Sequence, residues 1–173
     1  MSCFPICVDL TGKPVLLIGR GEQIRQKAEK LRPFGAELIY KDALPEDLEP
    51  ALVIVGDTPL DRAEAICEVC RRRRIPVNVV DVPRLCSFYF PALIQRGSLT
   101  VSLSTGGESP AAAGVLRRRL EEALPDNTED ILSWLGENRE VLRNRGILKA
   151  AAEEALGKNR PLTEEELLGL KKT

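Results

Sequence analysis

The stretch Pro14-Val-Leu-Leu-Ile-Gly-Arg-Gly21 decides the fold. Its apolar part is short, continuous and bounded by glycines, which is typical of a strand buried in a parallel sheet. The segment 22–34 then carries apolar side chains at helical spacing and ends at Gly35. A second strand begins at Glu37. Strand, glycine turn, helix and strand together predict a βαβ unit.

The same alternation continues toward the middle of the chain. We expect a third strand at 52–55, a helix at 60–73 and a fourth strand at 75–80. Strands and helices that alternate at this rhythm form a parallel sheet with right-handed crossovers. The first part of the chain, up to about residue 82, is therefore predicted to be Rossmann-like.

After residue 82 the pattern changes. Residues 99–104 alternate between apolar and polar, which predicts a half-exposed antiparallel strand, with 88–94 as its partner. Ser109-Pro110 opens a helix that runs to about Leu124, and the later segments have helical character throughout. We therefore expect an α/β fold with three parts: a Rossmann-like parallel sheet (1–82), a small α+β domain (83–124) and a C-terminal helical domain (125–173).

The composition excludes several classes of function. The chain has 173 residues and a net charge of −1, so no global field draws it to nucleic acid or to a membrane surface. No apolar run approaches the ~20 residues that span a bilayer, and the N-terminus lacks a secretory pattern. We therefore expect a cytoplasmic protein.

The chain contains no histidine, so proton transfer and metal binding fall to its carboxylates, cysteines, lysines and tyrosines. Five cysteines without a secretory signal argue against a disulfide framework. Cys67 and Cys70 lie within a predicted helix rather than at its start, where a redox motif would sit. We interpret them as buried structural thiols.

Gly19-Arg-Gly21 follows a strand and opens a helix, which is the setting of a dinucleotide-binding turn. Its glycines permit a tight turn and close approach of a pyrophosphate, and the helix supplies free N–H groups. Ile24 stands where the pattern has a third glycine or an alanine, and Asp42 is the nearest acidic candidate for the ribose. A glycine turn that binds no nucleotide remains the alternative.

Asp81 lies at the end of the fourth predicted strand, the edge at which open α/β sheets bind ligands. The alternative is an ordinary turn, because aspartate and proline both favour turns and Pro83 follows closely. Two arginine runs, 71–74 and 117–119, are either solvated helix surface or sites for an anionic ligand.

These segments, in this order, resemble the family of precorrin-2 dehydrogenases and sirohydrochlorin ferrochelatases, which includes the N-terminal module of siroheme synthases. The resemblance runs from about residue 4 to 124. It is carried most specifically by Asn78-Val-Val-Asp81 and Ser104-Thr-Gly-Gly107-x-Ser109-Pro110, and further by Phe4-Pro5, Leu10-x-Gly12-Lys13, Gly19-x-Gly21-Glu22, Lys27 and Leu85-Cys86-x-Phe88-x-Phe90-Pro91-Ala92.

The resemblance implies an NAD-binding domain, a dimerisation domain and a C-terminal helical domain in an intertwined homodimer. It implies oxidation of precorrin-2 to sirohydrochlorin with NAD as hydride acceptor, and in many members insertion of Fe2+ to give siroheme. The net charge and the lack of a long apolar run lead us to expect no nucleic-acid partner and no membrane partner.

The resemblance also assigns roles to residues. Asp81 falls on the family's key carboxylate, which would act in catalysis and as a transient metal ligand during chelation. The residues implied for the cofactor are Gly19, Gly21, Glu22, Gln23, Asp42, Ala43, Gly56 and Asp57. Those implied for the tetrapyrrole are Asn78, Ser104, Thr105, Gly106, Gly107 and Arg117.

This chain departs from the family in its nucleotide-binding half. Arg20 and Ile24 replace a glycine and an alanine, the connection 41–51 is shorter than usual, and Val55-Gly-Asp-Thr58 replaces an Ala-Thr-Asp-Asp segment. A second hypothesis therefore stays open: a chelatase or tetrapyrrole-binding homologue that has lost NAD binding.

Overall fold

The computed structural model describes residues 3–171, which form two compact units. Ile6–Phe90 form the first, and the remaining described residues form the second. The division into three domains stays a prediction.

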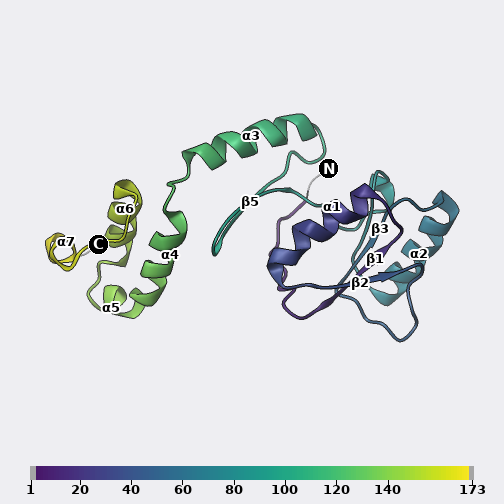
Figure 1. Cartoon of the computed structure of the whole chain (residues 1–173), viewed down its shortest axis with the longest axis horizontal. Coiled ribbons are helices and arrows are strands. Elements are labelled where there is room, and N and C mark those ends of the chain that lie inside the picture. Colours follow the sequence, from purple (N-terminus) through teal and green to yellow (C-terminus); the bar gives the residue numbers. More distant parts are fainter. Residues whose placement is uncertain (1–2, 172–173) are drawn as a thin grey trace. The chain divides into compact units, whose positions relative to one another are not determined.

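The first unit contains a parallel sheet of four strands, β1 (Pro14–Ile18), β2 (Glu37–Lys41), β3 (Leu52–Val55) and β4 (Val77–Val79). Their order is β2-β1-β3-β4 (Figure 1). The chain passes from β1 to β2 on one side and then returns to β3 on the other. The carboxyl ends of β1 and β3 therefore flank a topological switch point, where such sheets bind ligands.

The two faces of the sheet are covered by different helices because strand side chains alternate. Helix α1 (Glu22–Leu31), followed by a 3₁₀ turn at Arg32–Phe34, packs against one face, and helix α2 (Leu60–Arg73) packs against the other. The α1 core comprises Leu10, Val15, Leu17, Ile24, Ala28, Leu31, Leu52 and Ile54. The α2 core comprises Leu16, Ile18, Val53, Val55, Ala63, Ile66, Cys67, Cys70, Val77 and Val79.

The short connection between β2 and β3 contains no helix. Arg73 of α2 holds this connection in place, because its guanidinium donates hydrogen bonds to the carbonyl oxygens of Pro45, at 2.9 Å, and of Leu48. Arg71 pairs with Glu68, and Arg74 ends the helix in the left-handed conformation. The arginine run thus serves mainly to end the helix and hold this connection.

The segment after β4 runs along the edge of the sheet rather than forming a strand. The Ser87 N–H donates to the Val77 carbonyl at 2.8 Å, and the Val77 N–H donates to Ser87 Oγ at 2.8 Å. Phe88 and Phe90 pack on the α1 core. The expectation of a strand at 88–94 is therefore wrong at its start, because these aromatic rings are held by the core of the first unit.

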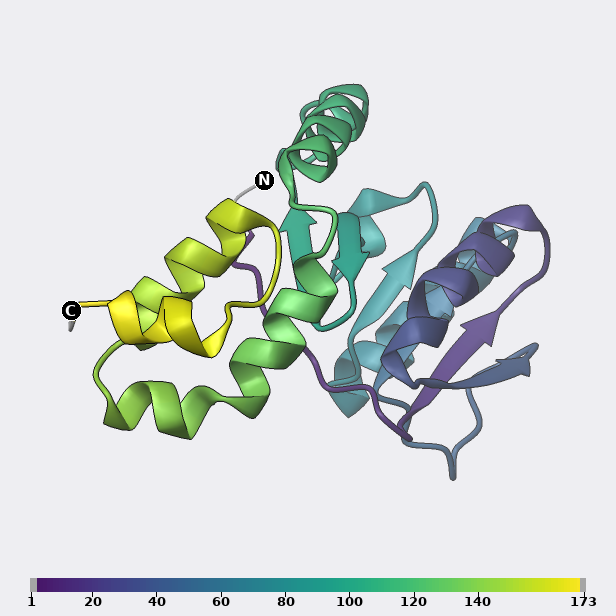
Figure 2. The ribbon, with the colours of Figure 1, turned by 60° about the vertical axis from the view of Figure 1, so that its left-hand side comes forward.

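The second unit begins with an antiparallel pair, β5 (Ala92–Arg96) and β6 (Leu99–Leu103), and continues into helix α3 (Pro110–Ala123), seen in Figure 2. Ser109 caps α3, since its Oγ accepts from the Ala112 N–H at 3.1 Å. Arg96 donates to the carbonyls of Pro125 and Glu121. These bonds join the hairpin to the end of α3.

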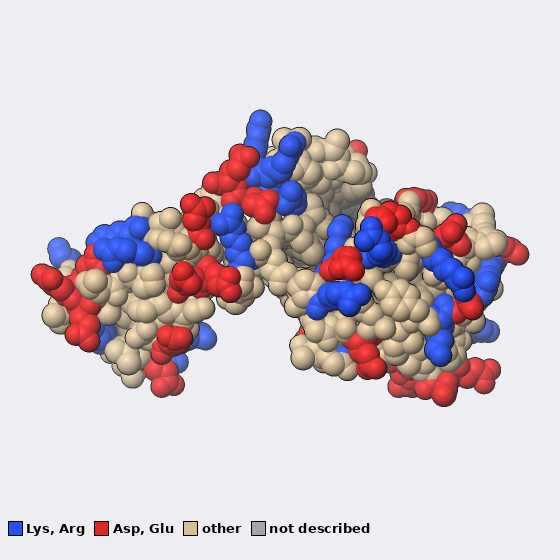
Figure 3. All heavy atoms as spheres, in the orientation of Figure 1, with Lys and Arg blue, Asp and Glu red and all other residues tan. Residues whose placement is uncertain are grey.

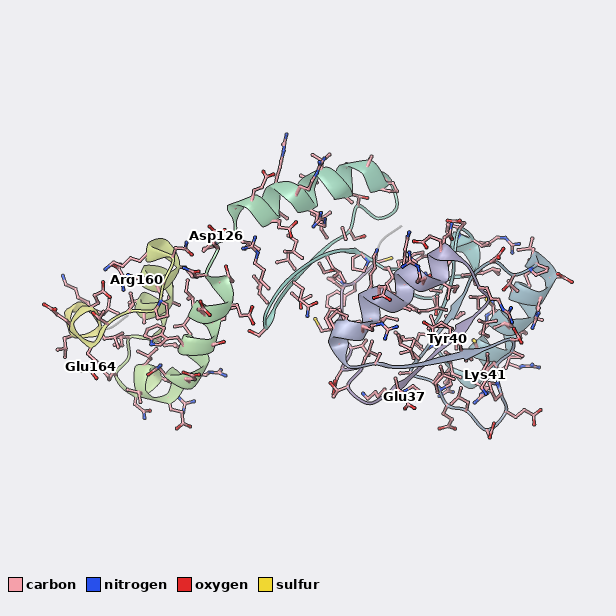
Figure 4. All side chains as sticks on the ribbon, viewed as in Figure 1. Glu37, Tyr40, Lys41, Asp126, Arg160 and Glu164 are labelled. Carbon is pink, nitrogen blue, oxygen red and sulfur yellow. The ribbon has the colours of Figure 1, made fainter. Side chains whose placement is uncertain are left out.

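Four helices follow in the second unit: α4 (Thr128–Glu137), α5 (Arg139–Asn144), α6 (Leu148–Lys158) and α7 (Glu164–Gly169). They share a core of Ile131, Leu142, Ile147, Ala151, Ala155 and Leu162. Thr163 and Glu166 form the predicted capping box. Arg160, on the loop before α7, and then Lys158 bind Glu166 and hold its pKa well below the usual range (Figure 4 labels Arg160).

Candidate functional site

A cavity of about 220 Å³ lies at the carboxyl edge of the sheet in the first unit. Its walls come from the ends of β1, β2 and β3 and the first turn of α2: Ile18, Gly19, Arg20, Asp42, Asp57, Thr58, Pro59 and Arg62. Three of the residues predicted for the cofactor, Gly19, Asp42 and Asp57, therefore meet at one cavity. Ala43 is exposed and lies outside this wall.

Gly19 cannot be replaced by a residue with a side chain without moving the backbone. Its φ is +98°, and a Cβ atom there would lie 1.6 Å from the Gly56 carbonyl oxygen. The same oxygen accepts a hydrogen bond from Thr58 Oγ1 at 3.0 Å. The turn after β1 and the turn after β3 thus touch backbone to backbone, which is the close packing that a glycine turn permits.

Ile24 is accommodated by Gly56. A Cβ atom at Gly56 would lie 2.8 Å from Ile24 Cγ1 and 2.9 Å from its Cδ1, so the isoleucine side chain fills the space that a larger residue would need. Ile24 is only 2% exposed. The two departures from the family pattern therefore complement each other, and α1 keeps its contact with β3.

The start of α1 is lined by acidic and polar groups. Glu22 binds Arg25 and Gln26, which lowers the pKa of Glu22. Asp57, in the left-handed conformation at φ 47°, places its Oδ2 3.8 Å from the position of a Cβ at Gly21. The glycine turn therefore has a carboxylate beside it as well as the free N–H groups of a helix start.

Asp81 lies one residue beyond Val80, whose N–H donates to the Val55 carbonyl and so extends the ladder with β3. Asp81 is exposed and has a φ of 61°. A non-glycine residue in this conformation costs roughly 1–2 kcal/mol, although aspartate tolerates it best. Such strain persists where surrounding structure fixes the residue, and here Gln23 Nε2 donates to Asp81 Oδ2 at 2.9 Å.

Two groups near Asp81 were not recognised as its neighbours from the sequence. Gln23 was predicted to touch the cofactor, and Lys27 had no role. One turn of helix separates them, so both project from the same face of α1. Lys27 Nζ lies 4.5 Å from the centre of the Phe90 ring. The four-residue spacing of Gln23 and Lys27 could have shown from the sequence that both project from one face of the helix. It could not have shown that this face is directed toward Asp81.

Asn78 is buried and holds the edge segment in place. Its Nδ2 donates to the Phe88 carbonyl at 2.9 Å, and the side chain is 6% exposed. The neighbouring Val79 N–H donates to Cys86 Sγ at 3.2 Å. Asn78 thus fixes the backbone that carries Phe88, next to the strand that ends at Asp81.

The remaining predicted substrate residues form a loop and a helix face in the second unit. Ser104 Oγ accepts from the Gly106 N–H at 3.2 Å, and Thr105 Oγ1 accepts from the Ser109 N–H at 3.3 Å. Gly106 and Gly107 have φ values of 64° and 87°. Arg117 pairs with Glu121 on α3. The loop is therefore a compact turn at the start of a capped helix.

Three cysteines of the first unit, Cys67, Cys70 and Cys86, line a second hollow, of about 420 Å³, between α2 and residues 84–87. Burial raises the pKa of the Cys67 and Cys86 thiols and raises that of Cys70 to about 11. Thiolate formation is thus disfavoured, which agrees with structural thiols. Among the described residues no group of three or more Cys, Asp and Glu is placed to hold a metal ion.

Iodoacetamide at pH 7.5 is expected to modify the exposed Cys3 and Cys7 well before Cys70. Cys70 is fully buried, and a pKa near 11 leaves little thiolate at that pH. Peptide mass mapping over time measures the order. In denaturant all five cysteines should react at similar rates. Early labelling of Cys70 in the folded protein would show that it is a reactive thiol.

The charged side chains of both signs are interspersed over the face seen in Figure 3, in keeping with the net charge of −1. Within residues 3–171, no helix combines the length and the apolar character needed to cross a membrane.

Comparison with known families gives two matches along the chain. Residues 38–92 match a family described as "Putative NAD(P)-binding", and residues 96–123 match the family "Sirohaem biosynthesis protein central". The first match begins after the glycine turn and includes Asp42, Asp57 and Asp81. The second includes the Ser104–Gly107 loop and α3.

Similar proteins agree with these matches. The chain is 30% identical to siroheme synthase 2 of Yersinia pestis (strain Pestoides F), over 84% of this chain and 37% of that protein. It is 35% identical to siroheme synthase of Thiobacillus denitrificans, over 72% of this chain and 31% of that protein. The chain thus spans about a third of the length of these relatives.

A solved structure, "SirC, precorrin-2 dehydrogenase", has the same fold. It superposes with a TM-score of 0.62 and 19% sequence identity, covering 97% of this chain and 94% of that one. The predicted α/β fold with a Rossmann-like sheet, a small antiparallel sheet and C-terminal helices is therefore confirmed. Taken with the family matches, these similarities relate most of this chain to the siroheme synthases, and the solved structure shares its fold.

Proposed function

We propose that this chain oxidises precorrin-2 to sirohydrochlorin with NAD as the hydride acceptor. One observation carries the proposal: Asp81 stands at the carboxyl edge of the same sheet that holds the Gly19 turn and the cavity between β1, β2 and β3. A carboxylate and a hollow beside a glycine turn within one unit suit a dehydrogenation that uses a dinucleotide. Similarity to siroheme synthases, and the fold shared with a precorrin-2 dehydrogenase, support the choice of substrate.

The reaction removes a hydride and a proton from the macrocycle. The hydride, with two electrons, goes to the nicotinamide, and the proton needs a base. Asp81 is our candidate for that base, because it is exposed at the ligand edge and the chain has no histidine. The hydrogen bond from Gln23 directs one of its oxygens and leaves the other for the substrate.

The residues present fit a dinucleotide. Gly19 allows the turn after β1 to approach the turn after β3, and the start of α1 offers N–H groups to the pyrophosphate through Gly21, Glu22 and Gln23. Asp42, at the end of β2, is proposed to bind the ribose hydroxyls, together with the neighbouring Ala43. Gly56 and Asp57, in the turn after β3, are proposed as further residues that would hold the dinucleotide. NAD supplies the hydride acceptor when bound.

We assign the tetrapyrrole to the residues carried over from the family: Asn78, Ser104, Thr105, Gly106, Gly107 and Arg117. The backbone N–H of Gly107 and the Arg117 guanidinium suit a polycarboxylate ligand. Asn78 is proposed to act mainly by holding Phe88, since its amide is buried and bonded.

Fe2+ insertion is a second proposed activity, with the metal as a substrate. Chelation requires loss of pyrrole N–H protons and a hard oxygen ligand to deliver the ion. Asp81 is the proposed transient ligand, because it is the exposed carboxylate at the ligand edge of β4.

The alternative, a chelatase or tetrapyrrole-binding protein that does not bind NAD, is favoured by two features of the cofactor turn. Arg20 stands within it, and the Asp57 carboxylate lies beside Gly21, where it opposes a pyrophosphate. Neither Arg20 nor the Asp57 carboxylate alters the residues around Asp81.

Incubation of the protein with precorrin-2 and NAD+, with and without Fe2+, tests the proposal when the absorption spectrum is followed. Formation of sirohydrochlorin that depends on NAD+ is the expected result. Calorimetric titration with NAD+ separates the alternatives. A protein that binds sirohydrochlorin but shows no heat with NAD+ and no oxidation would contradict the dehydrogenase and support the chelatase.

We also propose that the chain works as a homodimer in the cytoplasm. All five cysteines are free, as suits a reducing compartment. Helix α3 has no buried residue, and Val115, Leu116 and Leu120 are each more than 40% exposed. A two-stranded hairpin with an uncovered helix is only marginally stable by itself. We therefore propose that a second copy of the chain covers the exposed apolar side chains of α3.

Leu116→Asp is expected to convert the dimer to a monomer, because the carboxylate would be buried in the α3 interface. Size-exclusion chromatography with light scattering measures the mass. Leu168→Asp is the matched control, since Leu168 on α7 is 77% exposed and lies outside α3. A wild-type monomer, or a Leu116→Asp dimer of unchanged stability, would contradict this interface.

A further inference from the structure

Lys27 is a charged side chain in the first unit to which no role has been given. It lies on α1 one turn after Gln23, the residue that donates to Asp81. Its Nζ lies 4.5 Å from the centre of the Phe90 ring, within the range of a cation–π contact. Phe90 in turn contacts Phe88, with ring centres 5.5 Å apart. Lys27 is therefore held above an aromatic surface next to Asp81.

The Lys27 ammonium has no hydrogen-bond acceptor and no ion-pair partner within the described part of the chain, although its side chain is partly buried. Asp81 is near enough to influence Lys27 electrostatically but is bonded to Gln23 instead. Burial, and then the charge of Lys30, lower the pKa of Lys27, while Asp81 acts in the opposite direction. A cation that is partly removed from water with all three donors free is suited to an anionic ligand.

The surroundings define which anion fits. The ring of Phe90 and its neighbour Phe88 give an apolar surface, and Lys27 adds a positive charge beside it. A flat macrocycle that carries carboxylates offers both an aromatic-like face and an anion. An inorganic anion would be attracted by the charge of Lys27 but would make no favourable contact with the rings of Phe88 and Phe90.

We propose that Lys27 binds a carboxylate of the tetrapyrrole and so sets the position of the macrocycle over Asp81. This inference rests on the proposed function, since it names a residue that holds that substrate. It gives Gln23, Lys27 and Phe90 one purpose. Gln23 orients the carboxylate of Asp81, and Lys27 with Phe90 orients the ligand.

Lys27→Met keeps the length of the side chain and removes its charge. We expect the dissociation constant of sirohydrochlorin, measured by absorption titration, to rise by about tenfold or more, as for loss of a charge-assisted hydrogen bond. NAD+ binding, measured by calorimetry, should stay unchanged. In turnover, KM for precorrin-2 should rise more than kcat falls.

Two further variants separate charge from packing. Lys27→Arg keeps the charge and should bind sirohydrochlorin within about threefold of wild type, because a guanidinium also binds carboxylates and stacks on aromatic rings. Lys30→Met removes the next lysine of the same helix, which is exposed, and should change neither ligand's affinity. Circular dichroism confirms that each variant is folded. If Lys27→Met does not fold, the comparison of Lys27→Arg with Lys27→Gln decides.

Equal binding of sirohydrochlorin by wild type and Lys27→Met would overturn the inference, as would a parallel loss of NAD+ affinity, which indicates a structural role. A wild-type protein that binds no tetrapyrrole is a different result, because it overturns the proposed function itself. Selective weakening of tetrapyrrole binding in Lys27→Met, with recovery in Lys27→Arg, supports the inference.

Discussion

Asp81→Asn is expected to lower kcat for the oxidation of precorrin-2 by about 10²- to 10⁴-fold, the range that a general base contributes. The substitution removes the negative charge and keeps the shape. Asparagine tolerates the left-handed conformation that Asp81 adopts at φ 61°, and its side-chain oxygen can still accept from Gln23. The variant should therefore fold with nearly unchanged stability, which chemical denaturation measures.

The control for this variant is Asp47→Asn, in the exposed connection between β2 and β3. It removes the same negative charge at a position that is distant in the sequence from the end of β4, and it should retain full activity. If Asp81→Asn oxidises precorrin-2 at the wild-type rate, Asp81 is a turn residue and the base lies elsewhere. Chelation, assayed separately with sirohydrochlorin and Fe2+, should also fall if Asp81 delivers the metal.

Gly19→Ala is expected to destabilise the protein by about 3 kcal/mol or more and to abolish NAD+ binding. An alanine at φ +98° is strained, and its Cβ would lie 1.6 Å from the Gly56 carbonyl oxygen. No rotation of a side chain relieves that overlap, because both atoms belong to the backbone or are fixed to it. The turns after β1 and β3 must move apart, and the cavity between them changes shape.

Gly12→Ala provides the matched comparison. Gly12 also has a positive φ, +64°, but a Cβ there meets nothing within 4 Å. Gly12→Ala should lower the free energy of unfolding only by the cost of the left-handed backbone conformation at alanine, roughly 1–2 kcal/mol. It should leave NAD+ binding intact. Urea denaturation followed by circular dichroism measures both variants. Equal losses of stability in the two would show that the contact with Gly56 has no influence.

The strands of the first unit could be predicted because a buried parallel strand needs an apolar run, and runs such as 14–18 and 52–55 have few other uses. The position of Asp81 at a strand end followed from the same pattern. Phe88 and Phe90 were misplaced in a strand, because an aromatic residue fits either a strand or a core, and only the packing of α1 decides.

Other parts of the site depend on contacts between residues that are distant in the sequence. The periodicity of apolar residues along the chain gives no information about such contacts. Gln23 reaches Asp81 across 58 positions of the chain, and Lys27 lies over Phe90. The fit of Ile24 against Gly56 is of the same kind. Each residue alone is compatible with many neighbours, so the sequence predicted where these residues lie and not what they touch.

The contact between Ile24 and Gly56 constrains how this turn can change by single substitutions. A larger residue at 56 collides with the isoleucine, whereas a smaller residue at 24 leaves only a void, costing about 2–5 kcal/mol for loss of a buried isoleucine side chain. Replacement at 24 must therefore come first, and enlargement at 56 can follow and refill the space. Sequence exchange between this chain and its relatives is thus directional at these two positions: residue 24 can be replaced first at the cost of a void, whereas residue 56 cannot be enlarged while Ile24 is present.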